Sequence, residues 1–253
     1  MDDSTKRFTD RVEDYARYRP SYPDAAIDYL KTLCPPPGPV VDVGFGTGLF
    51  TERLLLAGYI VTGLEPNRAM LEVGDAAMRR YENFASMPGT AERLPVAAGS
   101  FGMIVAAQSF HWFDPEPTRK AFARALRPGG WVSLIWNNRE TDTTPFLVGY
   151  EAALNKYCPD YAKISATHAA EQEIEAFFAP DEVTKRSFPN HQELDWDGVR
   201  GRMMSSSYVP KSGPSHDALL GEVETLFQQE AKAGTVEVRY QTVLFSGQLS
   251  LHS

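Results

Sequence analysis

The sequence predicts an α/β fold with a small-molecule site at the carboxyl edge of a parallel sheet. The first observation is the run Val-Val-Asp-Val-Gly-Phe-Gly-Thr-Gly at residues 40–48, followed by a helical pattern at residues 49–55. A β-branched run, a glycine loop and a helix are typical of a buried strand that turns sharply into a helix. The second observation is an apolar run at residues 59–64 that ends in Glu65. Ligands bind at this edge of open α/β sheets.

The composition favours a single domain that acts on a small molecule. The chain has 253 residues, 43% of them hydrophobic, and its net charge is −8. No block of Lys and Arg is present, which argues against a surface that follows nucleic-acid phosphates. Cys34 and Cys158 lie far apart and in no metal-ligand spacing, so we expect no metal site. The N-terminal residues lack the apolar core of a signal peptide, and no apolar run reaches ~18 residues. We therefore expect a cytoplasmic protein without a membrane partner. We expect it to be a monomer or a homodimer.

The glycine loop favours a cationic cofactor over a phosphate-bearing one. Its spacing places Gly44, Gly46 and Gly48 at every second position, which differs from the Gly-x-Gly-x-x-Gly dinucleotide motif. No lysine is present for a P-loop. Glycine permits positive φ and leaves bare backbone against a ligand. The carboxylate of Asp42, two residues before the first glycine, suits a positively charged group better than a pyrophosphate.

Glu65 is predicted to bind ribose. It ends the second strand about 20 residues beyond the glycine loop, where nucleoside-binding sheets place an acid. A carboxylate there accepts hydrogen bonds from the 2′- and 3′-hydroxyls. The alternative is a solvated loop acid. Pro66-Asn67 then begins a helix that runs through Met70.

The remaining elements continue the α/β alternation and then depart from it. Strands are predicted at residues 83–87, 100–107 and 131–136, and a helix that begins with Pro115 lies between the last two. The later helices and strands are expected at residues 146–157, 171–178, 183–188, 197–205, 215–232 and 235–245.

Four motifs in the correct order resemble class I S-adenosylmethionine-dependent methyltransferases, specifically the methyltransferase type 11 domain. They are the Asp-x-Gly-x-Gly-x-Gly loop, Glu65-Pro66-Asn67 with Met70, the Ala91-Glu92-Arg93-Leu94-Pro95 loop, and Leu-Arg-Pro-Gly-Gly at residues 126–130. The string Gln-Ser-Phe-His-Trp-Phe-Asp at residues 108–114 is similar to the small-molecule group that includes the trans-aconitate methyltransferases. The resemblance implies a Rossmann-like, doubly wound sheet of seven strands, the last antiparallel.

The same resemblance implies how one domain is organised and which residues hold the cofactor. N-terminal lid helices would occupy residues 1–37, the cofactor-binding core 38–138, a helical lid insertion 139–181, and the closing strands and helices 182–253. S-adenosylmethionine would contact Asp42, Gly44, Phe45, Gly46, Thr47, Gly48, Glu65, Pro66, Met70, Thr90, Ala91, Glu92 and Gln108, with Tyr15 and Arg19 from the N-terminal segment.

Two positions depart from the family pattern. Phe45 stands where the commonest form has Cys, and Thr90 stands where an Asp usually meets the adenine. Backbone groups at Phe45 and Ala91 and the side chain of Glu92 could substitute. These departures keep open the alternative of a non-catalytic relative that retains only the cofactor fold.

The acceptor is expected to be a carboxylic acid or similar polar metabolite. His111 is the candidate base, with a structural helix cap as the alternative, and Trp112, Asn137 and Tyr208 are candidate substrate contacts. Arg139 lies at the same strand end. A carboxylate nucleophile needs no base, and no clear acid–base pair is present. The alternative acceptor is a hydrophobic or quinone-like metabolite, which an apolar cleft without arginines would favour.

Overall fold

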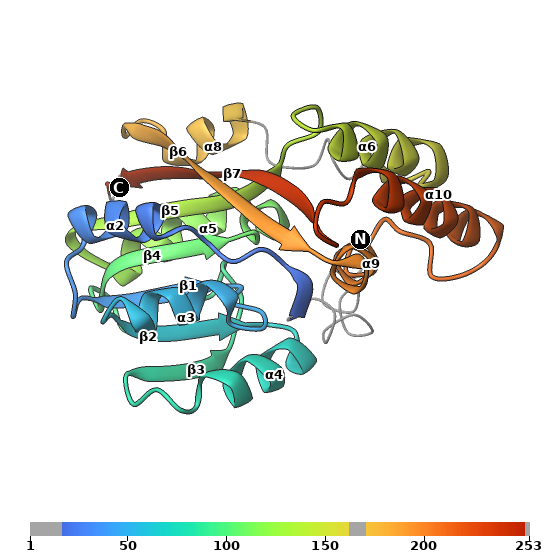
Figure 1. The fold of residues 1–253 in the computed structure, drawn as a ribbon. Helices are drawn as coiled ribbons and strands as arrows, with labels where there is room; N and C mark the ends of the chain where they lie inside the picture. The colour runs from blue at the N-terminus through green and yellow to red at the C-terminus, as the bar shows by residue number, and fades with distance from the viewer. Residues whose placement is uncertain (1–16, 162–170, 251–253) are drawn as a thin grey trace.

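A computed structural model shows a seven-stranded sheet in the order β3-β2-β1-β4-β5-β7-β6 (Figure 1). The structure describes residues 17–161 and 171–250. Strands β1 to β5 are parallel, and β7 is antiparallel to both β5 and β6. The predicted doubly wound α/β fold, with its last strand antiparallel, is therefore confirmed. The strands are β1 Pro39–Val43, β2 Ile60–Glu65, β3 Phe84–Pro88, β4 Phe101–Ala107, β5 Leu126–Arg139, β6 Val183–Leu194 and β7 Val236–Gln248.

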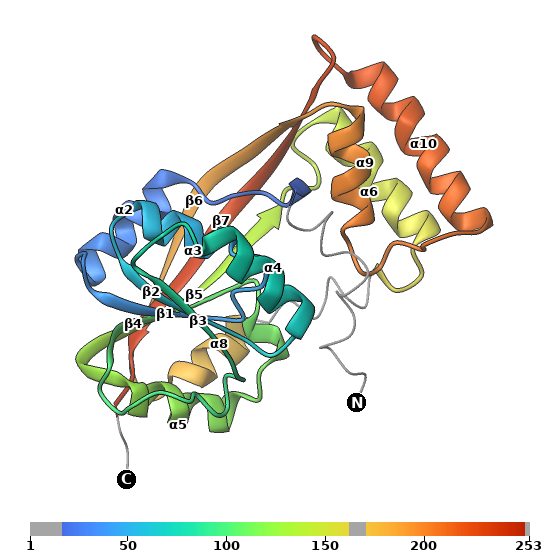
Figure 2. The ribbon, with the colours of Figure 1, turned by 90° about the horizontal axis from the view of Figure 1, so that it is seen from below.

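Helices cover both faces of this sheet (Figure 2). One face carries α2 (Asp24–Leu33), α3 (Leu49–Leu56) and α4 (Arg68–Met78), and the other carries α5 (Pro115–Ala125) and α8 (Glu171–Phe178). Because both faces are covered, β1 and β4 are apolar almost throughout rather than alternating. The rigid sheet fixes the positions of the loops at its carboxyl edge.

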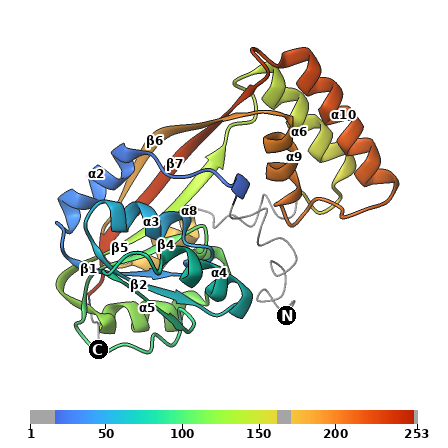
Figure 3. The same ribbon diagram turned by 60° about the horizontal axis from the view of Figure 1, so that its bottom comes forward.

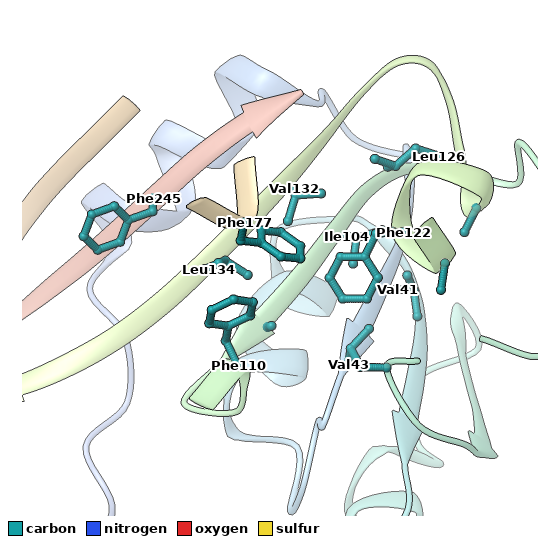
Figure 4. Close-up of a cluster of buried hydrophobic side chains, with 14 of the residues drawn as sticks. Val41, Val43, Ile104, Phe110, Phe122, Leu126, Val132, Leu134, Phe177 and Phe245 are labelled. Carbon is teal, nitrogen blue, oxygen red and sulfur yellow. The ribbon is translucent and has the colours of Figure 1, made fainter. Parts of the chain in front are cut away.

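The core on the α5 and α8 side is built from branched and aromatic side chains (Figure 4). Phe110 packs edge-on against Phe177, with ring centroids 4.9 Å apart, and Ile104 is fully buried beneath them. Edge-to-face aromatic pairs of this kind contribute about 0.5–1.5 kcal/mol beyond the area they bury. They tie the loop that follows β4 to the sheet.

Three further helices form a separate packed group at the carboxyl edge (Figure 3). Strands β5, β6 and β7 are longer than the others and carry α6 (Pro145–Tyr157), α9 (Trp196–Met204) and α10 (Pro214–Glu230). These helices share their own hydrophobic cluster with the ends of β6 and β7. We call α6, α9 and α10 the helical unit.

The structure differs from the expectation of one helical lid over residues 139–181. Helix α6 lies in the helical unit, whereas α8 packs on the sheet face beside α5 and β7. The physical reason lies in Ile174, Phe177 and Phe178, which make one face of α8 fully apolar and bury it in the main core. Only the α6 part of that segment stands beside the carboxyl edge.

The N-terminal segment also differs from a lid of helices over residues 1–37. Helix α2 buries Ala26, Ile27 and Leu30 against the sheet and is a core helix. Residues 1–16 lie outside the described residues. Among those described, no helix is both long and apolar enough to cross a membrane.

Candidate functional site

A cavity of about 280 Å³ opens at the carboxyl ends of β1, β2 and β4. The strand order reverses between β1 and β4, and open α/β sheets form their ligand crevice at such a point. Thirteen of the predicted site residues line it: Asp42, Gly44, Phe45, Gly46, Thr47, Glu65, Pro66, Met70, Thr90, Ala91, Glu92, Gln108 and Trp112.

The glycine loop presents bare backbone to this cavity. The N–H groups of Gly44 and Phe45 donate to Leu64 O at 2.7 and 3.2 Å, which fixes the loop to the end of β2. Gly46 adopts φ +58°, and a Cβ built there would meet nothing nearer than Gly44 O at 4.0 Å. A side chain at Gly46 would therefore be strained and would enter the ligand space.

Phe45 keeps its ring out of the cavity. The ring lies against Gly63 of β2 and Gly74 of α4, where added Cβ atoms would come within 2.7 and 2.5 Å of it. Phe45 is 5% exposed and packs edge-on against Phe84. Two glycines thus make the room that the large side chain needs, and the backbone of the loop remains available to a ligand.

This fit predicts a suppressor relationship. Gly63→Ala should lower the free energy of unfolding by about 1–3 kcal/mol, because its methyl group overlaps the Phe45 ring. In a Phe45→Cys background the same Gly63→Ala change should cost much less, because the ring that it would overlap is gone. Urea denaturation of the four proteins of this cycle measures the coupling. Gly221→Ala on α10 is the control, since its Cβ would meet no atom within 4 Å. An equal cost of Gly63→Ala in the wild-type and Phe45→Cys backgrounds would contradict the fit.

Glu65 is held in place by backbone groups at both carboxylate oxygens. Gly46 N–H donates to Oε2 at 3.0 Å, and Asn67 N–H donates to Oε1 at 2.9 Å. Burial raises the pKa of Glu65, although these two hydrogen bonds oppose the rise. Each oxygen retains accepting capacity toward the cavity that Glu65 lines.

Asp42 and Thr47 carry the cavity's unpaired polar atoms. Asp42 is fully buried, and its Oδ2 accepts from Thr51 Oγ1 at 2.7 Å. Its Oδ1 and the hydroxyl of Thr47 are buried with no hydrogen-bond partner among residues 17–161 and 171–250. Burial raises the pKa of Asp42 to about 7, and the charge of Glu65 adds to this effect. Buried polar atoms are rarely left unpaired, so both indicate a polar ligand.

The far wall of the cavity comes from the end of β4. Gln108 adopts φ +58°, an uncommon conformation for a residue other than glycine, and its N–H donates to Ile135 O at 2.8 Å. Its side chain donates to Asn137 O at 3.3 Å. Ser109 donates to Val43 O at 2.7 Å and lies directly against Gly44. Strained backbone of this kind concentrates at ligand sites.

Several predicted residues do not line the cavity. Gly48 packs against Met78, and Arg19 donates to Ser205 O at 3.0 Å. Asn137 donates to Ser21 O at 3.1 Å and holds the N-terminal segment. His111 lies in the 3₁₀ turn Phe110–Trp112 with its ring 4.8 Å from that of Trp112. Tyr208 packs in the helical unit, and Tyr15 lies outside the described residues.

Other cavity residues were not predicted from the sequence. Tyr22 packs on Phe50 with ring centroids 4.7 Å apart, and both line the cavity. Asn67 caps α4 by accepting from Met70 N–H at 3.1 Å. The N-cap pattern was a usable signal for Asn67. The resemblance implied that the segment containing Tyr22 covers the cofactor, but it did not name Tyr22 as a contact; the packing of Tyr22 on Phe50 of α3 places it there. Among the residues that the structure describes, no cluster of His, Cys, Asp and Glu could hold a metal ion.

Comparison with known proteins agrees with this geometry. A family model described as methyltransferase domain matches residues 41–134. An uncharacterized methyltransferase of Mycobacterium bovis is 40% identical over 138 residues, which cover 54% of this chain and 55% of the relative. That match therefore spans about half the length of the relative. An uncharacterized methyltransferase-like protein of Schizosaccharomyces pombe is 27% identical over 252 residues, covering 96% and 95% of the two chains.

The fold itself recurs in a solved structure. A putative type II methyltransferase from Anaeromyxobacter dehalogenans superimposes with a TM-score of 0.68 at 19% identity, covering 93% of this chain and 100% of the other. The domain match includes the glycine loop, Glu65 and the end of β4, which are the elements that build the cavity. Residues 41–134, which build most of the cavity, thus match a methyltransferase domain.

Proposed function

We propose that the protein transfers a methyl group from S-adenosylmethionine to a small acidic acceptor. The observation that carries this proposal is the set of unpaired polar atoms in the cavity beside the glycine loop. Asp42 Oδ1 and Thr47 Oγ1 are buried there without partners among the described residues, and a Cβ at Gly46 would enter the same space.

These residues fit the chemistry of the cofactor. The carboxylate of Asp42 suits the ammonium group, and the hydroxyl of Thr47 can donate to the carboxylate. Glu65, already oriented by two backbone N–H groups, would accept from the ribose hydroxyls. Thr90, Ala91 and Glu92 line the part of the cavity assigned to adenine. Glu92 is fixed there because its Oε1 accepts from Asp114 N–H at 3.0 Å.

The protein's part in the reaction is positioning and exclusion of water. The bound cofactor supplies an electrophilic methyl group on a sulfonium. The cavity walls Tyr22, Phe50 and Phe113 shield the site from water, and Gln108 is held rigidly at the wall next to β5. Holding the nucleophile in line at about 3–3.5 Å supplies most of the acceleration that such a transfer needs.

The ionisable groups of the cavity favour an acceptor that is already a nucleophile. Among the described residues, those lining the cavity include Asp42, Glu65 and Glu92 but no His, Lys or Cys. Both Asp42 and Glu65 are engaged in hydrogen bonds that fix the loop. A carboxylate needs no base, whereas a phenol or carbon acid would need one.

Methyl transfer from radiolabelled cofactor to a panel of carboxylic acids and phenols tests the proposal. We expect a methyl ester of at least one acid, from which mild base should release the label as volatile methanol. Transfer to phenols alone would favour the second candidate, an apolar or quinone-like acceptor. Two observations support that candidate: Trp112 and Phe113 form an aromatic part of the lining, and no arginine is among the described residues that line the cavity. Tight cofactor binding without transfer to any acceptor would support a non-catalytic relative.

The variant His111→Ala tests whether His111 acts as a general base or only positions the acceptor. Because His111 does not line the cavity, we expect kcat to fall by less than about tenfold and cofactor affinity to stay unchanged. Any loss should appear in the KM of the acceptor. The pH profile of kcat should keep its shape. A fall of about 100-fold or more in kcat would instead identify His111 as a general base.

A further inference from the structure

Two arginines and four tyrosines gather inside the helical unit and at the ends of β5 and β7. The arginines are Arg139, the last residue of β5, and Arg202 of α9. Both side chains line one small cavity of about 10 Å³ between the strands and helices α6 and α9. The phenols of Tyr150, Tyr161, Tyr208 and Tyr240 surround the two guanidinium groups.

Arg139 forms an ion pair and a hydrogen bond with neighbouring side chains. Its guanidinium donates to Glu151 Oε2 at 2.5 Å and to the Tyr161 hydroxyl at 3.0 Å. It also lies over the ring of Tyr150, 4.9 Å from the centroid. The Arg139 side chain is only 10% exposed. This residue has its counter-ion within the helical unit.

The described residues that accept hydrogen bonds from Arg202 are neutral, unlike the Glu151 partner of Arg139. The Nε of Arg202 donates to the Tyr240 hydroxyl at 3.3 Å and its Nη1 to Ser206 Oγ at 3.1 Å, both neutral acceptors. Within residues 17–161 and 171–250, no carboxylate forms an ion pair with it. Burial lowers the pKa of Arg202, but the oxygens of Tyr240, Tyr208 and Tyr150 outweigh this and raise it, so the guanidinium remains charged.

Among residues 17–161 and 171–250, one positive charge of the cluster has no anionic partner. Two guanidinium groups face the single carboxylate of Glu151. A largely enclosed charge without a counter-ion is costly, and proteins pair such charges or use them to bind a ligand. The hydroxyls of Tyr150 and Tyr208 make no hydrogen bond to the described residues and so remain available as donors. Arg202 as a whole residue is half-buried.

One member of the cluster, Arg139, lies on the strand that contacts the Gln108 wall of the cofactor cavity. Gln108, which lines that cavity, donates to Asn137 O, and Arg139 follows two residues further along β5. Two residues of strand span about 7 Å, which is within the reach of a small molecule. The helical unit stands at this same carboxyl edge (Figure 3).

We infer that Arg202 determines acceptor specificity by binding a carboxylate of the acceptor in the helical unit. The inference rests on the proposed methyl transfer and deepens it, because it assigns the residue that recognises the acid. Arg202 supplies the forked guanidinium, and the free hydroxyls of Tyr150 and Tyr208 complete the donor set. Arg139 remains paired with Glu151 and holds the end of β5 in place.

Direct binding of a small polycarboxylate tests this assignment without methyl transfer. Citrate is titrated calorimetrically into full-length protein saturated with S-adenosylhomocysteine, at low ionic strength. We expect Arg202→Gln to weaken citrate binding by about tenfold or more, because a charged hydrogen-bond donor is lost. Arg200→Gln is the matched control, because Arg200 is exposed on the same helix and undergoes the same charge change. It should alter citrate affinity by less than about twofold.

The outcomes separate the anion site from the proposed activity. The neutral trimethyl ester of citrate should not bind the wild-type protein, and each variant should bind S-adenosylhomocysteine as the wild type does. Should Arg202→Gln fail to fold, Arg202→Lys keeps the charge but loses the fork, and it should still bind citrate several-fold more weakly. Equal citrate affinity in wild type and the Arg202 variants, or no citrate binding by a protein that binds the cofactor product, would overturn the assignment. Failure to bind S-adenosylhomocysteine would instead count against the proposed function.

Discussion

Asp42→Asn should make the protein more stable at pH 8 in the absence of cofactor, and should weaken cofactor binding. Asp42 is fully buried, and burial raises its pKa from 3.8 to about 7. A folded-state pKa above the unfolded value means that this group's contribution to stability is complete below about pH 4. That contribution is lost as the pH rises toward and through 7. At pH 8 the wild-type protein therefore holds an ionised carboxylate in a place that disfavours it.

The amide removes this penalty. Asn retains an oxygen that can accept from the Thr51 hydroxyl but carries no charge. At about 1.4 kcal/mol per pKa unit, the gain in unfolding free energy at pH 8 has an upper limit of about 4 kcal/mol, and it should vanish near pH 4. Urea denaturation at a series of pH values measures it. Asp75→Asn, at an exposed carboxylate on α4, is the control for the chemical change. A gain that is independent of pH would contradict the explanation.

Cofactor binding should show the opposite sign. An ammonium group beside Asp42 favours the ionised carboxylate, so wild-type affinity should rise with pH through about 7 and binding should release protons. Calorimetry in two buffers of different ionisation enthalpy counts those protons. In Asp42→Asn, the affinity at pH 8 should fall by about tenfold or more, and the proton release should disappear. Unchanged proton release in the variant would place the titrating group elsewhere.

Glu65→Ala should weaken binding of S-adenosylmethionine by about 1–3 kcal/mol, which corresponds to roughly 5- to 150-fold in the dissociation constant. Two effects act together. The ribose hydroxyls lose a charged acceptor, and the buried N–H groups of Gly46 and Asn67 lose the partners that shape the loop. Glu65→Gln should also bind poorly, because its amide NH₂ would face one of those backbone donors.

The control for this prediction lies on the next helix. Glu72→Ala removes an exposed carboxylate of α4 that pairs with Arg68, so cofactor affinity should stay within about twofold of wild type. Calorimetric titration with S-adenosylhomocysteine measures all four proteins. Wild-type affinity in Glu65→Ala would place the ribose outside the cavity described above.

The cofactor half of the site follows closely from local sequence. Residues 40–65 contain the strand, the glycine loop, the helix and the acid in one uninterrupted stretch. Positive φ at Gly44, Gly46 and Gly48 is a local demand, and only glycine meets it without strain. This stretch contains six of the predicted cofactor residues that line the cavity, and the family resemblance implied the other six.

The consequences of Phe45 could not be predicted in the same way. At the sequence level Phe45 was only a departure from the family pattern. Its effect depends on Gly63 and Gly74, which lie 18 and 29 positions further along the chain and meet the ring only after folding. The departure at Phe45 is therefore a packing arrangement: Gly63 and Gly74 have no side chains, and the space that this leaves holds the Phe45 ring.

The acceptor half of the site depended on tertiary structure for a similar reason. Asn137 has the polar side chain and strand-end position of a substrate ligand, yet Ser21, Asn190 and Thr242 engage its amide. Arg202 carries no motif, and its lack of an anionic partner among the described residues is visible only when α9, β5 and β7 meet. Hydrogen bonds and ion pairs between distant segments decide which polar side chains are engaged within the protein and which are available to a ligand.

The sequence by itself determined the α/β class and the cofactor loop, since both rest on short-range patterns of side-chain size and backbone freedom. The tertiary structure decided which helices cover the carboxyl edge. An apolar face buries α8 in the main core, while α6 joins α9 and α10 beside the site. Burial also set the charge properties of Asp42, because desolvation depends on every neighbour that displaces water and not on the residue's place in the chain.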